Sequence, residues 1–205
     1  MNIAVIGSGN IGSTLAGKWK EKGHRVLVGA RNPETTKGKE KLLAADIPVL
    51  SIQDAVRQSD ILLLATPAMA AVEVAKALGD TTGKIILDAG NIVMGRGPQG
   101  FPNVAEAILA NTATRDVVKC FNTTGFNNML NPQYQGTPID LFMAGDSVRG
   151  KEIARQLALD AGFAECYDVG GNSHFTLMEQ FAFFWINLAM FQGQGREIGF
   201  KLLKR

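Results

Sequence analysis

The chain has few of the residues that most metal and nucleophile chemistry requires. Of its 205 residues only two are cysteine and two are histidine, and Cys120 and Cys166 have no metal-binding or redox spacing. We therefore expect no metal site and two reduced thiols in a cytoplasmic protein. The glycine-rich stretch described below begins at residue 7, so we expect no targeting segment ahead of it.

The sequence also lacks a strong charge of either sign and a long uninterrupted apolar run. Its net charge is +2, from 21 Lys and Arg against 19 Asp and Glu, too mild to favour nucleic acid or a membrane surface. The most apolar stretch, residues 175–191, is interrupted by Glu179, Gln180 and Asn187, which favours a buried or intersubunit helix over a membrane span. We expect small molecules and a second copy of the chain as partners.

The opening of the chain has the order strand, glycine loop, helix, strand. Residues 2–6 and 25–28 are short apolar runs, and residues 11–22 have the apolar spacing of a helix. Between the first run and the helix lies a G-x-G-x-x-G sequence, formed by Gly7, Ser8, Gly9, Asn10, Ile11 and Gly12. In this setting the pattern predicts a dinucleotide site, because the glycines allow a tight turn and let the backbone approach the pyrophosphate. The free N–H groups at the helix start then face the phosphates.

The end of the second strand indicates which dinucleotide binds. NAD sites usually have an acidic residue there, whereas this chain has Arg31 followed by Asn32. The guanidinium of Arg31 suits a ribose 2′-phosphate, and Asn32 could donate to the same group. The alternative is that Arg31 is a solvated turn residue and that Asn32 and Pro33 cap a helix over residues 34–45. Capping and phosphate binding are compatible, so we favour NADP over NAD.

Apolar runs and helical patterns alternate up to residue 169. The sequence predicts strands around residue 49 and at 61–65, 85–87, 117–121, 139–144 and 163–169, and helices at 52–58, 69–78, 104–110 and 148–160. This alternation predicts an α/β fold with a Rossmann-type doubly wound parallel sheet. We expect residues 1–170 to form the NADP-binding domain.

Candidate site residues follow three of the predicted strands. Thr66 and Pro67 come after the strand at residues 61–65, Asn91 after the strand at 85–87, and Asn122 after the strand at 117–121. Ligands in such folds bind outside the carboxyl ends of the strands, so these residues are expected at the site. The glycine- and proline-rich stretch 92–102 is either a functional loop at this edge or a plain connector.

Residues 171–205 differ from the rest of the chain. From residue 173 to 203 the pattern is helical and rich in phenylalanine, and a helix apolar on so many sides must be buried. We therefore expect a C-terminal helical tail that helps to close the site and packs against a second copy in a homodimer. Gly193, Gly195 and Gly199 predict a bend with close backbone approach, either within the tail or beside a ligand.

The chain offers few acid–base groups at the predicted site. His24 precedes the second strand on the wrong side of the sheet, His174 precedes the tail helix, and Asp88 is expected to hydrogen-bond loop amides. No lysine lies in an apolar helix ahead of the tail, where dehydrogenases of β-hydroxy acids place theirs. Hydride transfer from a nicotinamide requires positioning rather than a nucleophile, so we predict no catalytic side chain of that kind.

Several segments are similar to the NADPH-dependent reductases of the deazaflavin coenzyme F420, and the resemblance runs almost end to end. They are the glycine loop, the turn Gly29-Ala30-Arg31, the strand end Ala65-Thr66-Pro67 and the tail at residues 187–200. Residues 118–123 also resemble a stretch in the oxidoreductase domain of the STEAP metalloreductases, which pass hydride to a flavin.

The resemblance implies roles for individual residues. Ser8, Asn10 and Ile11 would lie along the pyrophosphate, and Arg31 and Asn32 would take the 2′-phosphate. The nicotinamide would be flanked by Thr66, Pro67 and Asn91.

Together these observations predict an NADP(H)-dependent oxidoreductase that moves hydride between the nicotinamide and a flavin or deazaflavin acceptor such as F420, FMN or FAD. Positioning by Thr66, Asn91 and Asn122 would be its main catalytic device. One alternative is a reductase of a small carbonyl or imine, with His174 or a water as proton donor. Another is a redox sensor that binds NADP without turnover.

Overall fold

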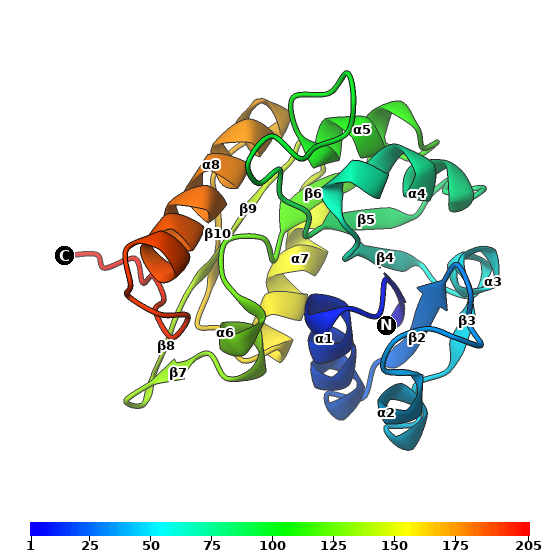
Figure 1. Cartoon of the computed structure of the whole chain (residues 1–205), viewed down its shortest axis with the longest axis horizontal. Helices are drawn as coiled ribbons and strands as arrows, with labels where there is room; N and C mark the ends of the chain where they lie inside the picture. The colour runs from blue at the N-terminus through cyan, green and yellow to red at the C-terminus, as the bar shows by residue number, and fades with distance from the viewer.

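The computed structural model describes all 205 residues and has three layers, an eight-stranded sheet with helices on both faces (Figure 1). The strands of the sheet are β1 (Asn2–Ile6), β2 (Arg25–Ala30), β3 (Val49–Ser51), β4 (Ile61–Leu64), β5 (Ile85–Asp88), β6 (Val117–Cys120), β9 (Leu141–Ala144) and β10 (Cys166–Asp168). Their order is β10-β9-β6-β5-β4-β1-β2-β3. The predicted Rossmann-type fold is confirmed, with one difference: β9 pairs antiparallel with β6, so the sheet is mixed.

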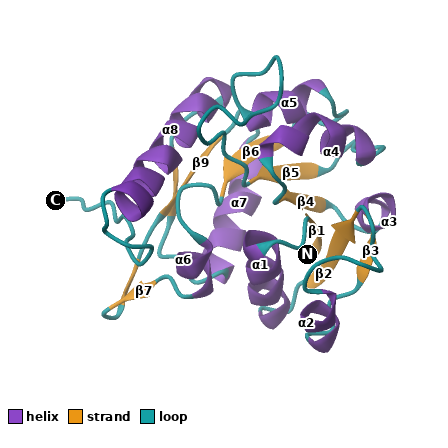
Figure 2. Ribbon diagram, viewed as in Figure 1, coloured by secondary structure: helices purple, strands orange, loops and turns teal.

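Two sets of helices cover the two faces of the sheet (Figure 2). One face is covered by α1 (Asn10–Glu21), α2 (Lys39–Ala44), α6 (Phe126–Leu130) and α7 (Val148–Asp160). The other is covered by α3 (Ile52–Arg57), α4 (Ala71–Ala77), α5 (Val104–Ala110) and α8 (Phe175–Ile186). Short pieces complete the chain: the 3₁₀ turns η1 (Ala68–Ala70) and η2 (Asn172–His174), the π turn η3 (Asn187–Phe191), and the hairpin β7 (Gln133–Tyr134) and β8 (Thr137–Pro138).

Apolar residues on both faces of the central strands hold the layers together. Every residue of β4 is buried, as expected of a parallel strand covered on both sides. On the α1 face, Trp19 is fully buried against Phe121, with ring centroids 5.5 Å apart. The indole N–H of Trp19 donates to the carbonyl of Leu157 at 2.9 Å, which satisfies the polar atom and ties α1 to α7.

The direction of winding reverses at the middle of the sheet. Strand β1 pairs in parallel with β2 on one side and with β4 on the other, so the chain proceeds outward in opposite directions from this point. The loops after β1 and β4 therefore diverge and leave a crevice at the carboxyl ends of the strands. Ligands of open α/β sheets bind at such a point.

The helix predicted over residues 34–45 is wrong in its first half, because α2 begins only at Lys39. Gly38 has a φ of 77°, which interrupts a helix, and Thr36 uses its hydroxyl to contact Ser8 Oγ at 2.9 Å. The side chain of Asn32 accepts from the N–H of Glu34 at 3.2 Å in a local turn instead of capping a helix. Residues 31–38 thus lie beside the glycine loop.

The predicted helix over residues 173–203 is also too long. Helix α8 and the π turn end at Phe191, and the rest of the tail is irregular. Gly193 and Gly195 have φ values of 71° and 74°, and the carbonyl of Ile198 accepts from the Trp185 indole at 2.7 Å rather than from a helical N–H. No helix in the structure has both the length and the apolar character needed to cross a membrane.

Candidate functional site

The glycine loop after β1 has the geometry that its sequence predicts. Gly7 has a φ of 109°, and a Cβ there would lie 2.6 Å from the carbonyl oxygen of Ala65. A Cβ on Gly12 would lie 2.0 Å from the carbonyl oxygen of Gly7, so only glycine allows α1 to start so close to the turn. A Cβ on Gly9 would meet no atom within 4 Å, which leaves its surface open to a ligand. Helix α1 starts without a side-chain cap, so its first N–H groups are available to an anion.

The crevice at the winding reversal is a cleft with two connected lobes. The smaller lobe has a volume of about 370 Å³ and the larger about 570 Å³, and both are lined by Gly9, Ala65, Thr66 and Pro67. Every predicted site residue except Gly12, which lies beneath the loop, lines one of them. In the smaller lobe these are Gly7, Ser8, Gly9, Arg31, Asn32, Thr66 and Pro67. In the larger lobe they are Gly9, Asn10, Ile11, Thr66, Pro67, Asn91 and Asn122.

One cationic side chain, Arg31, lies at the open end of the smaller lobe. It is 76% exposed, and its guanidinium is 3.4 Å from the carboxylate of Glu73, a weak surface pair. Thr35 and Thr36 line the same lobe, although sequence reasoning placed them in a helix. Their hydroxyls add polar groups around the position where an anion would contact Arg31.

Two asparagines from neighbouring strand ends form a reciprocal amide pair in the larger lobe. The Asn91 amide donates to the carbonyl of Asn122 at 2.8 Å, and the Asn122 amide donates to Asn91 Oδ1 at 2.9 Å and to the carbonyl of Met178 at 3.1 Å. Phe121, with a φ of 62°, turns the chain before Asn122. The Oδ1 atom of Asn122 is buried without a hydrogen-bond partner, although the residue lines the lobe. It is therefore an acceptor that the fold itself leaves unsatisfied beside the lobe.

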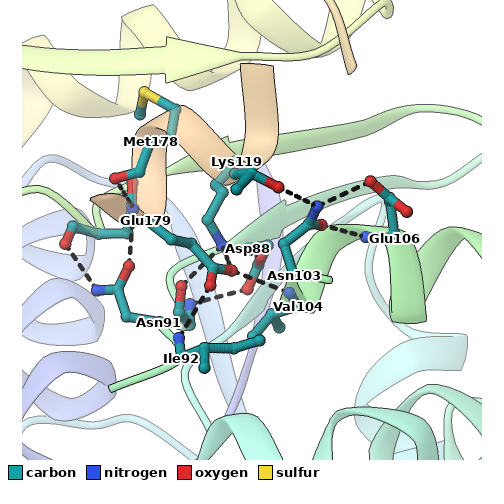
Figure 3. Close-up of polar contacts among 12 residues, drawn as sticks. Asp88, Asn91, Ile92, Asn103, Val104, Glu106, Lys119, Met178 and Glu179 are labelled. Carbon is teal, nitrogen blue, oxygen red and sulfur yellow. Dashed lines mark hydrogen bonds and ion pairs between the residues drawn. The ribbon is translucent and has the colours of Figure 1, made fainter. Parts of the chain in front are cut away.

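Behind this pair lies the buried charge cluster, formed by Lys119, Asp88 and Glu179 (Figure 3). The ammonium of Lys119 is 2.6 Å from Asp88 Oδ2 and 2.8 Å from Glu179 Oε1, and it donates to the carbonyl of Gly90 at 2.8 Å. Burial raises the pKa of the Asp88 carboxyl, and the Lys119 ammonium opposes that rise. The cluster joins β5, β6 and α8 at the edge of the larger lobe.

Sequence reasoning found Asp88 but missed its two partners. Asp88 Oδ1 accepts from the N–H of Gly90 at 2.8 Å, as predicted. The missed signal was a lysine in the middle of an apolar strand, because a buried lysine requires carboxylate partners. Asp88 supplies one of them from the neighbouring strand β5, where it lies opposite Lys119 in the register of the sheet.

The far wall of the larger lobe comes from α6 and the tail. Trp185 lines it, and a Cβ on Gly125 would lie 2.6 Å from the Trp185 ring. Phe126 lies below the guanidinium of Arg196, which is 5.4 Å from the ring centroid, and Arg196 also donates to Asn127 Oδ1 at 3.1 Å. The tail was expected to help close the site, but the contact of Arg196 with Phe126 and Asn127 from α6 was not predicted.

Neither histidine lies in the cleft. His174 lines neither lobe, which is contrary to its predicted alternative role as a proton donor to a substrate, and its ring contacts Ser173 Oγ at 3.2 Å. His24, expected on the opposite side of the sheet, contacts Asp160 there at 2.9 Å. Arg196 is the only titratable side chain that lines the larger lobe.

The winding reversal, the glycine loop and the two-lobed cleft define the class, a Rossmann-type α/β protein with a cleft of the kind that holds dinucleotides. Within that class, residues 2–92 match the model of the family described as NADP oxidoreductase, coenzyme F420-dependent. The predicted resemblance to the F420-linked reductases is thereby confirmed over this segment. The similarity to the STEAP oxidoreductase domain stays a prediction.

One curated protein illustrates how far the sequence likeness extends. The chain is 35% identical over 102 residues to a glycerol-3-phosphate dehydrogenase [NAD(P)+] from Chlorobium phaeobacteroides, a match that covers 43% of this chain and 31% of that protein. The chain therefore matches about a third of the length of this relative.

Solved structures extend the likeness of fold to the whole chain. A protein from Arthrobacter sp. FB24, provisionally assigned as an F420-dependent NADP reductase, superposes with a TM-score of 0.85 over 100% of both chains at 24% identity. A reductive aminase from Aspergillus terreus, in complex with NADPH and ethyl levulinate, gives a TM-score of 0.66 over 94% of this chain and 62% of that one, at 19% identity. At these identities the likeness concerns the fold.

Proposed function

We propose that this protein is an NADP(H)-dependent oxidoreductase that transfers hydride between the nicotinamide and a flavin or deazaflavin acceptor. The observation that carries the proposal is the two-lobed cleft across the winding reversal, with the glycine loop at its centre. The matched family and the NADPH complex of a structurally similar reductase support the choice of cofactor.

The residues of the cleft fit the two ends of the dinucleotide. In the smaller lobe Arg31 and Asn32 would hold the 2′-phosphate, and the open surface of Gly9 would admit the pyrophosphate. In the larger lobe Asn91 and the unpartnered Oδ1 of Asn122 would orient the nicotinamide amide. When bound, the dinucleotide supplies the hydride, and the chain supplies position and exclusion of water.

The lack of a proton donor favours a flavin-type acceptor over a carbonyl or imine. Arg196 is the only titratable group that lines the larger lobe, and a guanidinium is a fixed charge rather than a source of a transferable proton. Reduction of a carbonyl requires a proton at the substrate oxygen, whereas a conjugated ring system spreads the added charge and can be protonated by solvent. The flat faces of Trp185 and Phe126 suit a planar acceptor, and Arg196 suits an anionic group on it.

The acceptor assay tests this proposal. Oxidation of NADPH, followed at its own absorbance, should start when FMN, FAD or coenzyme F420 is added and should be slow without them. Rapid oxidation with a small imine or ketone instead would support the reductase alternative. Tight NADPH binding without turnover of any acceptor would support the sensor alternative.

Arg31→Ala should weaken NADPH binding by about 1.5–3 kcal/mol, the loss expected for a hydrogen bond to a charged group, and should leave NADH binding almost unchanged. Arg25→Ala is the matched control, because Arg25 lies at the amino end of β2, away from the carboxyl end that precedes Arg31, and contacts Gln58. Calorimetric titration of each variant with both cofactors measures the difference. Equal losses for NADPH and NADH would contradict the phosphate role of Arg31.

We also propose that the tail forms part of a homodimer interface and that residues 171–205 close the site. Exposed apolar side chains follow one another along α8 and the π turn, namely Leu177, Phe183, Phe184, Met190 and Phe191. Single exposed apolar residues are common on protein surfaces, whereas a run of them along one element is typical of an interaction surface. A monomer in sedimentation equilibrium at micromolar concentration would contradict the dimer.

A further inference from the structure

The buried charge cluster contains one ammonium and two carboxylates. Asp88 Oδ1 faces the N–H of Gly90 at 2.8 Å and Asp88 Oδ2 faces the Lys119 ammonium at 2.6 Å. Glu179 Oε1 faces the N–H of Val104 at 2.9 Å as well as Lys119, and Oε2 faces the N–H of Ile92 at 2.9 Å.

Every oxygen of both carboxylates therefore accepts a hydrogen bond from nitrogen. None of these contacts offers an acceptor for a carboxyl proton, so the hydrogen bonds from Lys119 and Gly90 oppose the rise in the pKa of Asp88 that burial causes. With both carboxylates ionised, one positive and two negative groups give the cluster a net charge of −1.

This charge lies directly behind residues that line the larger lobe. Ala89, Gly90 and Asn91 line the lobe and directly follow Asp88 in the chain. Lys119 and Asp88 are fully buried and Glu179 is only 6% exposed, so solvent and salt screen the cluster little. The other charged group at the lobe, Arg196, belongs to an exposed residue on the opposite wall, where water screens it.

We propose that the net negative charge of the buried charge cluster makes the larger lobe bind the oxidised, positively charged nicotinamide more tightly than the reduced, neutral one. The inference rests on the proposed function, because it assigns the nicotinamide to this lobe. Loss of a hydride, two electrons and one proton, converts the neutral dihydronicotinamide into a cation, and the flavin-type acceptor gains that hydride. A lobe that prefers the cation favours donation of hydride from NADPH over its return. The cluster would thus make the bound cofactor a better hydride donor, as NADPH, than a hydride acceptor, as NADP⁺.

The test compares dissociation constants for NADP⁺ and NADPH, each measured by calorimetric titration of the full chain. Asp88→Asn and Glu179→Gln each remove one negative charge with little change in size. Each should weaken the binding of NADP⁺ relative to that of NADPH by at least about tenfold, as expected for the loss of one poorly screened charge near the ring. Asp60→Asn is the control, because Asp60 is an exposed residue before the amino end of β4, and its ratio should not move.

The outcomes separate this inference from the function on which it rests. Folded variants that bind both cofactors with the wild-type ratio would overturn the electrostatic role but leave the proposed function intact. A wild-type protein that binds neither cofactor would overturn both. If both variants fail to fold, the ratio of the two dissociation constants of the wild-type protein is the test. Tighter binding of NADP⁺ than of NADPH would support the inference, and tighter binding of NADPH would contradict it.

Discussion

Gly12→Ala is expected to destabilise the protein by about 3 kcal/mol or more and to abolish NADPH binding. The added Cβ would lie 2.0 Å from the carbonyl oxygen of Gly7 and 3.1 Å from a methyl group of Val5. Because the first of these contacts is backbone, it cannot be relieved by a rotamer change, and α1 would have to move away from β1. That movement would displace the N–H groups that face the cleft. Urea unfolding and calorimetric titration measure the two effects.

The matched control for this substitution lies on the same helix. Gly17 also belongs to α1, but a Cβ there would meet no atom within 4 Å. Gly17→Ala should stabilise the protein by roughly 0.5–1 kcal/mol, because alanine is the better helix former, and should leave NADPH binding unchanged. A Gly12→Ala variant with wild-type stability and affinity would contradict the close packing of helix and strand.

Lys119→Met is expected to lower the free energy of unfolding by about 3–5 kcal/mol, because it leaves two buried carboxylates without their cation. Asp88 and Glu179 would then have to be protonated or exposed to water. Adding Asp88→Asn to Lys119→Met should recover part of the loss, since one of the uncompensated charges is removed. Urea unfolding of the single and double variants at neutral pH measures the coupling.

An exposed lysine provides the comparison. Lys20 contacts Asp46 at 2.7 Å, but the Asp46 side chain is 91% exposed, so Lys20→Met should not change the stability measurably. Losses of similar size for the Lys20 and Lys119 variants would show that burial does not decide the strength of the pair.

Local patterns were enough to predict most residues of the smaller lobe and the strand ends of the larger one. The turn at Gly7, the close contact at Gly12 and the position of Arg31 depend on residues near one another in the sequence. We could predict that Thr66, Asn91 and Asn122 lie together, because the carboxyl ends of parallel strands meet at one edge of the sheet. The structure gathers these residues in one cleft.

The other half of the site depends on contacts between distant parts of the chain. Glu179 reaches Lys119 only because α8 packs across the face of the sheet, and no local period encodes that contact. The irregular tail was missed for a similar reason. Its Ile198 carbonyl accepts from Asn128 at 2.7 Å as well as from Trp185, and these tertiary hydrogen bonds replace the helical ones that propensity favours.

The antiparallel pairing of β9 with β6 has a consequence for how this protein can vary. Because β9 runs against β6, and β10 runs parallel to β9, the loops after these two strands leave from the edge opposite the cleft. The far wall of the larger lobe is therefore left to α6 and to a late stretch of the chain, α8 and the residues after it. Substitutions in residues 175–205 can change the shape of that lobe while the glycine loop, at the other end of the sequence, stays as it is.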